Sequence, residues 1–238
     1  MASRYSNVLS PAGGAEPAGP PRRPKGIRLW AWVAIAAQVA FVASWLAAAS
    51  WQGPRYSVLA HSISDMYAIT APHGSFLVVV FTDCGAATIL FALFSVWPML
   101  RPGGRAATVG SVLLALSAGG LGDLLTPAER LACRMADPGC TTARALSNAG
   151  GKLDDILTTG GLLLLVAAGF FLAHAMARIP GWQAWARPAR WTAVLILALL
   201  AADVADSGLN GLFERLVAAT GAAAIAALAV GVLRRSRT

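Results

Sequence analysis

The stretch Arg55–Tyr67 holds the densest group of residues that could do chemistry. It reads RYSVLAHSISDMY and brings together His61, Ser62, Ser64 and Asp65. Serine, histidine and aspartate are the side chains of a nucleophilic triad, in which the histidine takes the serine proton and the carboxylate orients the ring. Residues that are neighbours in sequence rarely form such a triad. The sequence therefore favours a polar loop that contributes acid–base groups, foremost His61 and Asp65.

Two further aspartates lie inside strongly apolar segments. Asp83 follows Ser75 by eight residues, roughly 12 Å into one segment at 1.5 Å per residue. Asp203 precedes Leu209 by six residues, roughly 9 Å from the end of another segment. A charged side chain at that depth is destabilising unless it faces a cavity, is paired or takes up a proton. We therefore expect Asp83 and Asp203 to point into the protein and to share one site as catalytic groups.

More acidic residues lie towards the same ends of the apolar segments. Burial in apolar surroundings raises the pKa of a carboxyl group, so a pocket formed by these residues could supply protons at neutral pH. The expected pocket has the catalytic candidates His61, Asp65, Asp83, Asp155 and Asp203 and the lining residues Ser62, Ser64, Asp123, Asp154, Asp206 and Glu214.

Several of these acids also have a simpler explanation. Asp154 or Asp155 can cap the start of a helix, and Glu214 suits the first turn of another. Asp123 and Asp206 lie so near the ends of apolar segments that solvation alone explains them.

The histidines suggest a metal site only weakly. His61 and His73 with one aspartate would supply the two nitrogens and one oxygen of some zinc sites. The chain contains neither an HExxH nor a CxxC motif, so ordinary loop histidines are favoured. We predict no metal and no cofactor.

The composition identifies the elements that must position these residues. The chain is 57% apolar and 13% charged, against about 25% charged in soluble domains, and its mean hydropathy is +0.62. Six apolar runs approach the roughly 20 residues that cross a bilayer core. They are Leu29–Ser50, Ser75–Trp97, Ala106–Leu125, Ile156–Ala177, Trp191–Leu209 and Leu212–Leu233. Short connections between them predict an all-α membrane protein with six transmembrane helices in an antiparallel up-down bundle.

Charge along the chain predicts its organisation and orientation. Residues 1–27 are rich in Pro, Gly, Ala and Ser and should form a disordered cytoplasmic tail, followed by the transmembrane domain at 28–233 and a basic cytoplasmic tail at 234–238. The two tails, the adjoining Arg28 and the second and fourth connections (98–105 and 178–190) hold 13 of the 19 basic residues and one of the 11 acids. By the positive-inside rule both termini are cytoplasmic and the Arg55–Tyr67 loop faces outward.

The basic residues also bear on partners and location. They are dispersed between apolar runs despite a net charge of +8, so we predict membrane lipids and no nucleic acid as partners. The abundance of arginine, alanine and glycine is typical of a GC-rich bacterial genome, and we expect a multi-pass protein of the bacterial plasma membrane.

Three cysteines divide into two kinds. Cys133 and Cys140 lie in one connection on the outward side, where an oxidising environment favours a local disulfide. Cys84 lies within an apolar run and should be a free, buried thiol.

Four short motifs carry a family resemblance. RYSVLAHSISDMYA, GLGDLLTP, LDDILTTGG and GLFERL resemble, in order and spacing, the bacterial six-helix membrane family known as domain of unknown function 998, over Leu29–Leu233. Members of that family often carry HGxLHD at the start of the fourth span, and the matching stretch here is Gly150–Asp155. The resemblance retains Asp155 but replaces both histidines, which weakens any histidine-dependent role.

Two classes of function fit these observations. The first is a membrane-embedded enzyme acting on a lipid or another hydrophobic small molecule, with buried aspartates as acid–base groups. The second is a non-catalytic carrier or binding subunit for a cation, a proton or a basic ligand. The acids gather towards one side of the membrane, which favours the enzyme.

Overall fold

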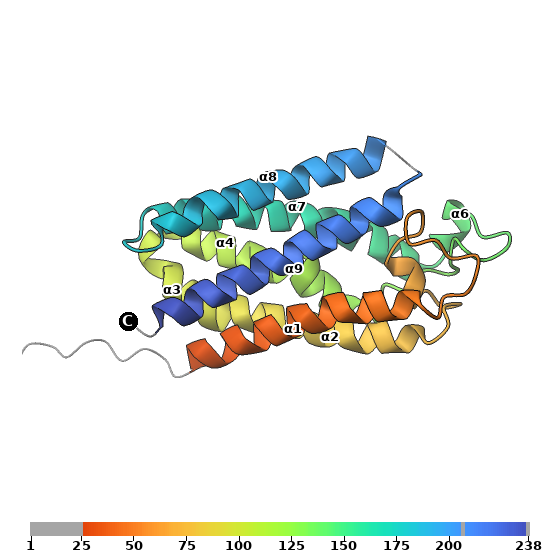
Figure 1. The fold of residues 1–238 in the computed structure, drawn as a ribbon, viewed down its shortest axis with the longest axis horizontal. Helices are drawn as coiled ribbons and strands as arrows, with labels where there is room; N and C mark the ends of the chain where they lie inside the picture. Colours follow the sequence, from red (N-terminus) through yellow and green to blue (C-terminus); the bar gives the residue numbers. More distant parts are fainter. Residues whose placement is uncertain (1–25, 206–207, 237–238) are drawn as a thin grey trace, which may run out of the picture.

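A computed structural model describes residues 26–205 and 208–236 of the chain. Six helical spans, each long and apolar enough to cross a membrane, form one bundle (Figure 1). Within the described residues there are helices and turns but no strand. The chain is therefore an all-helical membrane protein, as predicted. Residues 1–25 of the expected tail, Asp206 and the last two residues lie outside the described part.

Four of the spans are uninterrupted helices, whereas the second and third are each assembled from several pieces. The uninterrupted spans are α1 (Gly26–Ala49), α7 (Ala149–Ala177), α8 (Gln183–Ala205) and α9 (Asn210–Arg235). The second span consists of α2 (Gly74–Phe91), the π-helical turn η2 (Ala92–Val96), α3 (Trp97–Leu100) and the 3-10 turn η3 (Arg101–Gly103). The third consists of α4 (Arg105–Leu116), the π-helical turn η4 (Ala118–Gly122) and α5 (Asp123–Leu125).

Several helices extend beyond the apolar runs that predicted them. α1 begins at Gly26, inside the stretch expected to be a tail, and α8 begins at Gln183, eight residues before the expected start at Trp191. α7 begins at Ala149 because Asn148 Oδ1 accepts a hydrogen bond from the Gly151 N–H at 2.7 Å. Such polar first turns leave no mark in an apolar pattern, so the sequence could not locate them.

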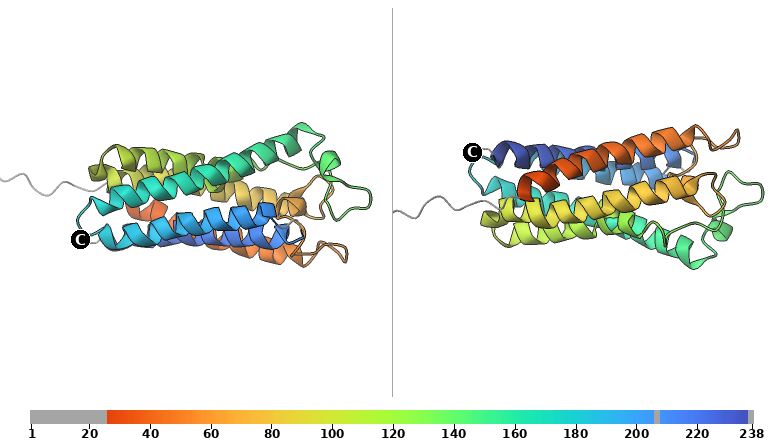
Figure 2. Two further views of the ribbon diagram at one scale, coloured as in Figure 1. Left: turned by 90° about the horizontal axis from the view of Figure 1, so that it is seen from above. Right: turned by 90° about the horizontal axis from the view of Figure 1, so that it is seen from below.

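Successive spans run in opposite directions and close into a ring. α1 packs on both α2 and α9, α7 packs on both α4 and α8, and α8 packs on α9 (Figures 1 and 2). Residues 50–73 and 126–148 meet at one end of the bundle, which we call the loop end. α1 starts and α9 ends at the opposite, terminal end (Figure 1).

Residues 50–73 and 126–148 together form what we call the cap. The cap contains the 3-10 turn η1 (Ser64–Tyr67) and the short helix α6 (Thr142–Ala145). Its two segments are joined by backbone and side-chain hydrogen bonds: the Ile69 N–H donates to the Leu131 carbonyl at 2.9 Å, and Arg130 donates to the carbonyls of Tyr67 and Ala68. The cap therefore covers the loop end as one unit.

Candidate functional site

A cavity of about 110 Å³ lies inside the loop-end half of the bundle, below the cap. Three carboxyl groups line it, from Asp123, Glu129 and Glu214, together with the polar side chains of Gln38 and Tyr67. No lysine or arginine is among its described lining residues. We call it the acidic cavity. Towards the middle of the bundle its lining becomes apolar.

A break in the third span forms one wall of the acidic cavity. α4 ends at Leu116 because Ser117 is extended, with φ −68° and ψ 173°, and η4 then leads to Asp123. Residues 118, 119, 122 and 123 of this broken segment line the cavity. Irregular backbone at membrane depth is tolerated where it is buried in protein or lines a cavity, so the break marks this wall as a site.

Two glycines let neighbouring helices approach the broken segment. A Cβ at Gly85 of α2 would lie 2.2 Å from the Leu124 backbone nitrogen, and one at Gly161 of α7 would lie 2.6 Å from the Ala118 nitrogen. Any side chain at either position would push its helix away. Gly85 of the second span and Gly161 of the fourth span therefore set the position of the cavity wall.

Glu129 is the most unusual group in the acidic cavity. Its side chain is 3% exposed, and its Oε1 has no hydrogen-bond partner among the described residues. Burial, followed by the negative charge of Asp154, raises the pKa of Glu129 from 4.5 to about 8. The carboxyl group is therefore protonated at neutral pH, and one of its oxygens is buried without a hydrogen-bond partner among the described residues.

Asp154 does not line the acidic cavity itself but accepts a hydrogen bond from Tyr67, which does. The Tyr67 hydroxyl donates to Asp154 Oδ1 at 2.9 Å, and both side chains are buried. Burial and then the Asp154 charge raise the pKa of Tyr67 well above its usual range, so the phenol stays protonated. Asp154 thus fixes the orientation of a cavity-lining hydroxyl.

The first turn of α9 attaches the cap to the bundle. Glu214 Oε2 accepts a hydrogen bond from the Ile63 N–H at 2.8 Å. Arg215, 9% exposed, donates to the carbonyls of Val58 and His61 at 2.8 Å and to that of Gly211 at 2.7 Å. Each of these bonds to a charged group is typically worth about 1.5–3 kcal/mol. Arg215 is therefore a structural cation that holds the cap over the acidic cavity.

Arg215 also contacts two aromatic side chains, those of Trp45 and Tyr56. Its guanidinium lies 6.0 Å from the centre of the Trp45 ring and 5.9 Å from that of Tyr56, and it donates to the Tyr56 hydroxyl. Burial is the main cause that raises the pKa of Tyr56 to about 12, so this hydroxyl is neutral.

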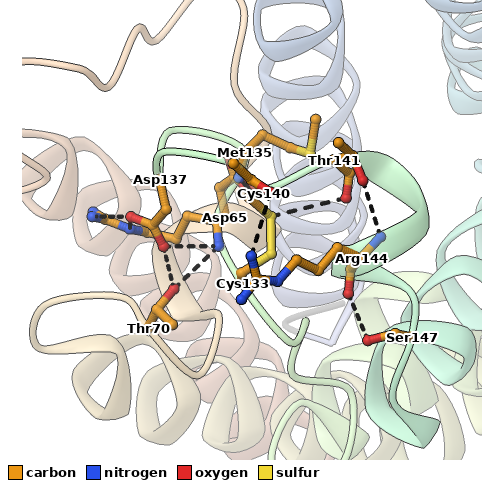
Figure 3. Close-up of a disulfide and its surroundings, with 11 residues drawn as sticks. Asp65, Thr70, Cys133, Met135, Asp137, Cys140, Thr141, Arg144 and Ser147 are labelled. Carbon is orange, nitrogen blue, oxygen red and sulfur yellow. Dashed lines mark hydrogen bonds and ion pairs between the residues drawn. A yellow bond between two sulfur atoms is a disulfide. The ribbon is translucent and has the colours of Figure 1, made fainter.

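Asp65 lies in the cap, not on the acidic cavity. It is fully buried, its Oδ1 accepts from the Met135 N–H at 2.9 Å, and its Oδ2 has no partner among the described residues. Burial raises the pKa of Asp65. Close by, Arg134 pairs with Asp137 at 2.6 Å, and its hydrogen bond lowers the pKa of Asp137 although burial opposes it (Figure 3). Asp65 joins the two segments of the cap.

The predicted disulfide between Cys133 and Cys140 is present beside Asp65, within the second segment of the cap (Figure 3). Cys84 is free and buried, and its thiol donates to the Ala37 carbonyl at 3.1 Å. Both expectations for the cysteines are confirmed.

His61, Ser62 and Ser64 are occupied by bonds within the cap. His61 Nδ1 accepts from the Ser57 N–H at 2.8 Å. The hydroxyls of Ser62 and Ser64 lie 2.9 Å apart. The Ser62 hydroxyl also accepts a hydrogen bond from the Asp65 N–H at 3.1 Å. Within the described residues no hydrogen bond joins the His61 ring to either serine or to Asp65, so this geometry is not that of a triad.

Asp83 and Asp203, which were expected to share one site, lie in different surroundings. Asp83 is exposed on α2, because Gly85 faces α5 and a residue two positions away points about 200° around the helix. Asp203 is half-buried at the end of α8 and accepts from Asn210 Nδ2 at 3.1 Å. Neither lines the acidic cavity. Asp155 is exposed as well, and its neighbour Asp154 is the buried member of that pair.

The cavity therefore combines predicted and unpredicted residues. Asp123 and Glu214 were expected to line a pocket, and they do line this one. Glu129 and Gln38 were missed. Glu129 follows Pro127 in a polar connection, where a carboxylate is expected to be solvated. Gln38 is an isolated polar residue in the middle of an apolar run. The GLGDLLTP motif next to Glu129 was the available signal.

Within the described residues no group of three or more His, Cys, Asp or Glu side chains is arranged to hold a metal ion. Three carboxyl groups, those of Asp123, Glu129 and Glu214, line the acidic cavity. They can donate or accept protons and can balance a positive charge.

Comparison with known proteins gives one match. The model of a family described as protein of unknown function (DUF998) matches residues 34–231. No curated protein and no solved structure matches the chain.

Proposed function

Because the chain belongs to the DUF998 family, whose description names no activity, we propose its function from the acidic cavity. We propose that it is a membrane-embedded enzyme that carries out acid–base chemistry on a lipid or another hydrophobic molecule. Its reacting groups are Glu129 and Asp123, and the polar end of the substrate enters the cavity between them.

A single observation carries this proposal: Glu129 is buried on the cavity and has one oxygen without a hydrogen-bond partner among the described residues. An unpaired buried polar atom costs about 1–3 kcal/mol and calls for a reason, such as a ligand that supplies the missing bond. With a pKa of about 8, Glu129 holds a proton at neutral pH and can give it up near that pH. A general acid works best with a pKa near the working pH.

The other acids have supporting roles in this proposal. Asp123 lines the same cavity and would accept a proton or stabilise positive charge on the substrate. One oxygen of Glu214 accepts a hydrogen bond from the Ile63 N–H, so Glu214 holds the cap over the acidic cavity. Asp154 orients the Tyr67 hydroxyl.

The apolar side chains in the terminal half of the bundle favour an enzyme over an ion carrier. A proton or ion path needs polar groups through the whole membrane. In the terminal half of the bundle a second cavity is lined almost entirely by apolar side chains, and none of its described lining residues is charged. The acidic cavity is suited to receive its substrate from the bilayer.

Orientation and location belong to this proposal. The 13 basic residues assigned to one side support a cytoplasmic terminal end and an outward-facing cap. The Cys133–Cys140 disulfide in the cap agrees with an oxidising exterior. We infer a bacterial plasma membrane with both termini cytoplasmic.

Untargeted lipid analysis of cells lacking the gene tests the proposal. The cells are complemented with wild type, with Glu129→Gln or with Asp155→Asn, which alters an exposed acid outside the cavity. A lipid species should change on deletion and be restored by wild type and Asp155→Asn but not by Glu129→Gln. Restoration by all three, or an unchanged lipid profile with altered tolerance of a cation, would reject the enzyme in favour of a carrier.

A further inference from the structure

A second cavity, of about 130 Å³, lies in the terminal half of the bundle between α7, α8 and α9. Leu172, Met176, Ala189, Ala224 and Leu228 are among its lining residues. We call it the apolar cavity. The cavity is partly open to the surroundings of the bundle, and its apolar lining gains packing energy when an apolar group fills it.

The two cavities are neighbours inside the bundle and share part of their walls. Leu165 of α7 and Ile225 of α9 line both of them. Along α9 the lining residues of the two cavities together extend from Glu214 to Leu228, about 21 Å at 1.5 Å per residue. That is a large part of the roughly 30 Å hydrocarbon core. The two cavities in a row are polar at one end and apolar at the other, and a chain that displaces the Leu165 and Ile225 side chains between them would give an amphiphile a matching site.

The charges of the lining residues indicate the polar group. Asp123, Glu129 and Glu214 line the acidic cavity without a lysine or arginine among the described lining residues. The nearby cation, Arg215, already donates to three backbone carbonyls and to Tyr56. An ammonium group brings three hydrogen-bond donors and a positive charge, so it can bond to Glu129 Oε1 and to a second carboxyl group.

We propose that the substrate is a long-chain amphiphile with an amine head group, whose ammonium lies between Asp123 and Glu129 and whose hydrocarbon chain passes Leu165 and Ile225 into the apolar cavity. This inference rests on the proposed function and specifies its substrate class. The small side chains at Ala189 and Ala224 leave the room that the chain occupies.

Photo-labelling of the purified protein in lipid nanodiscs tests the inference. The probe is a long-chain alkylamine with a photoreactive group at the end of its chain, and labelled peptides are mapped by mass spectrometry. Labels should concentrate on the segments of α7, α8 and α9 that line the apolar cavity. An unlabelled long-chain alkylamine should compete, whereas the alcohol of the same chain length should compete about tenfold less well, because it lacks the charge-assisted bonds.

Matched variants locate the chain and the head group. Ala224→Phe fills the apolar cavity and should reduce its labelling about tenfold by steric exclusion. Ala223→Phe, on the neighbouring exposed residue, should leave labelling unchanged. If Ala224→Phe does not fold, Ala224→Leu should give a smaller loss in the same direction. A bound ammonium favours the ionised form of Glu129, and glutamine cannot ionise, so Glu129→Gln should weaken labelling by the amine.

Each outcome separates the two proposals. Labelling spread over the lipid-facing surface, or insensitive to residue 224, overturns the assignment of the chain. Equal competition by the alcohol overturns the amine. Labelling as expected, with a lipid profile that Glu129→Gln restores, supports the binding site and rejects the enzyme.

Discussion

Replacing Glu129 by glutamine should remove a loss of stability that the wild type shows as pH rises. In the unfolded chain this carboxyl group loses its proton near pH 4.5, whereas in the folded protein it keeps it up to about pH 8. Between these values the folded protein binds one more proton than the unfolded chain. The free energy of unfolding therefore falls by about 1.4 kcal/mol per pH unit, and by about 5 kcal/mol over the whole interval.

Glutamine keeps the shape of the side chain but has no proton to lose. Thermal unfolding of the purified protein, followed by tryptophan fluorescence from pH 5 to pH 9, measures the difference. The groups whose charges couple to Glu129 are Asp123, Asp154 and Tyr67, and they are present in both proteins. Wild type should lose stability relative to Glu129→Gln as pH rises towards 8, and the gap should then level off.

The exposed residue Asp155 provides the control. Asp155→Asn also removes a carboxyl group near the start of α7, but from the surface, so it should keep the wild-type dependence on pH. Parallel curves for wild type and Glu129→Gln would refute the argument that burial holds a proton on Glu129.

Three further predictions concern the cap and the topology. Reporter fusions should read external after Pro138 and cytoplasmic after Arg187; the reverse pattern would contradict the orientation. Peptide mapping of alkylated, non-reduced protein should find Cys133 and Cys140 joined, and alkylation of both without reduction would exclude the bridge. Tyr67→Phe should lower the free energy of unfolding by about 1–3 kcal/mol, because a buried carboxyl oxygen loses its donor, and an unchanged melting curve would show that the bond contributes nothing.

Local sequence patterns were sufficient for the spans and the disulfide. Six apolar runs predicted six spans in the right order, because a bilayer demands about 20 apolar residues for each crossing. Cys133 and Cys140 lie seven residues apart in one loop, so their pairing needed no knowledge of distant contacts.

The residues that line the acidic cavity could not all be predicted from local sequence patterns. Depth along a helix suggested that Asp83 is buried, but the direction in which a side chain points depends on which face packs, and Gly85 turns the other face of α2 towards α5. Glu129 lies in a connection where a carboxylate is expected to be solvated, yet it is buried in the folded protein.

The sequence by itself determined that this chain crosses a membrane with six helices, because length and hydropathy are properties of each segment alone. Only the tertiary structure decided which acids meet. Contact between the broken third span, Tyr67, Glu129 and Glu214 depends on rotation and close approach of helices that are far apart in sequence, and these are set by side-chain packing across the whole bundle.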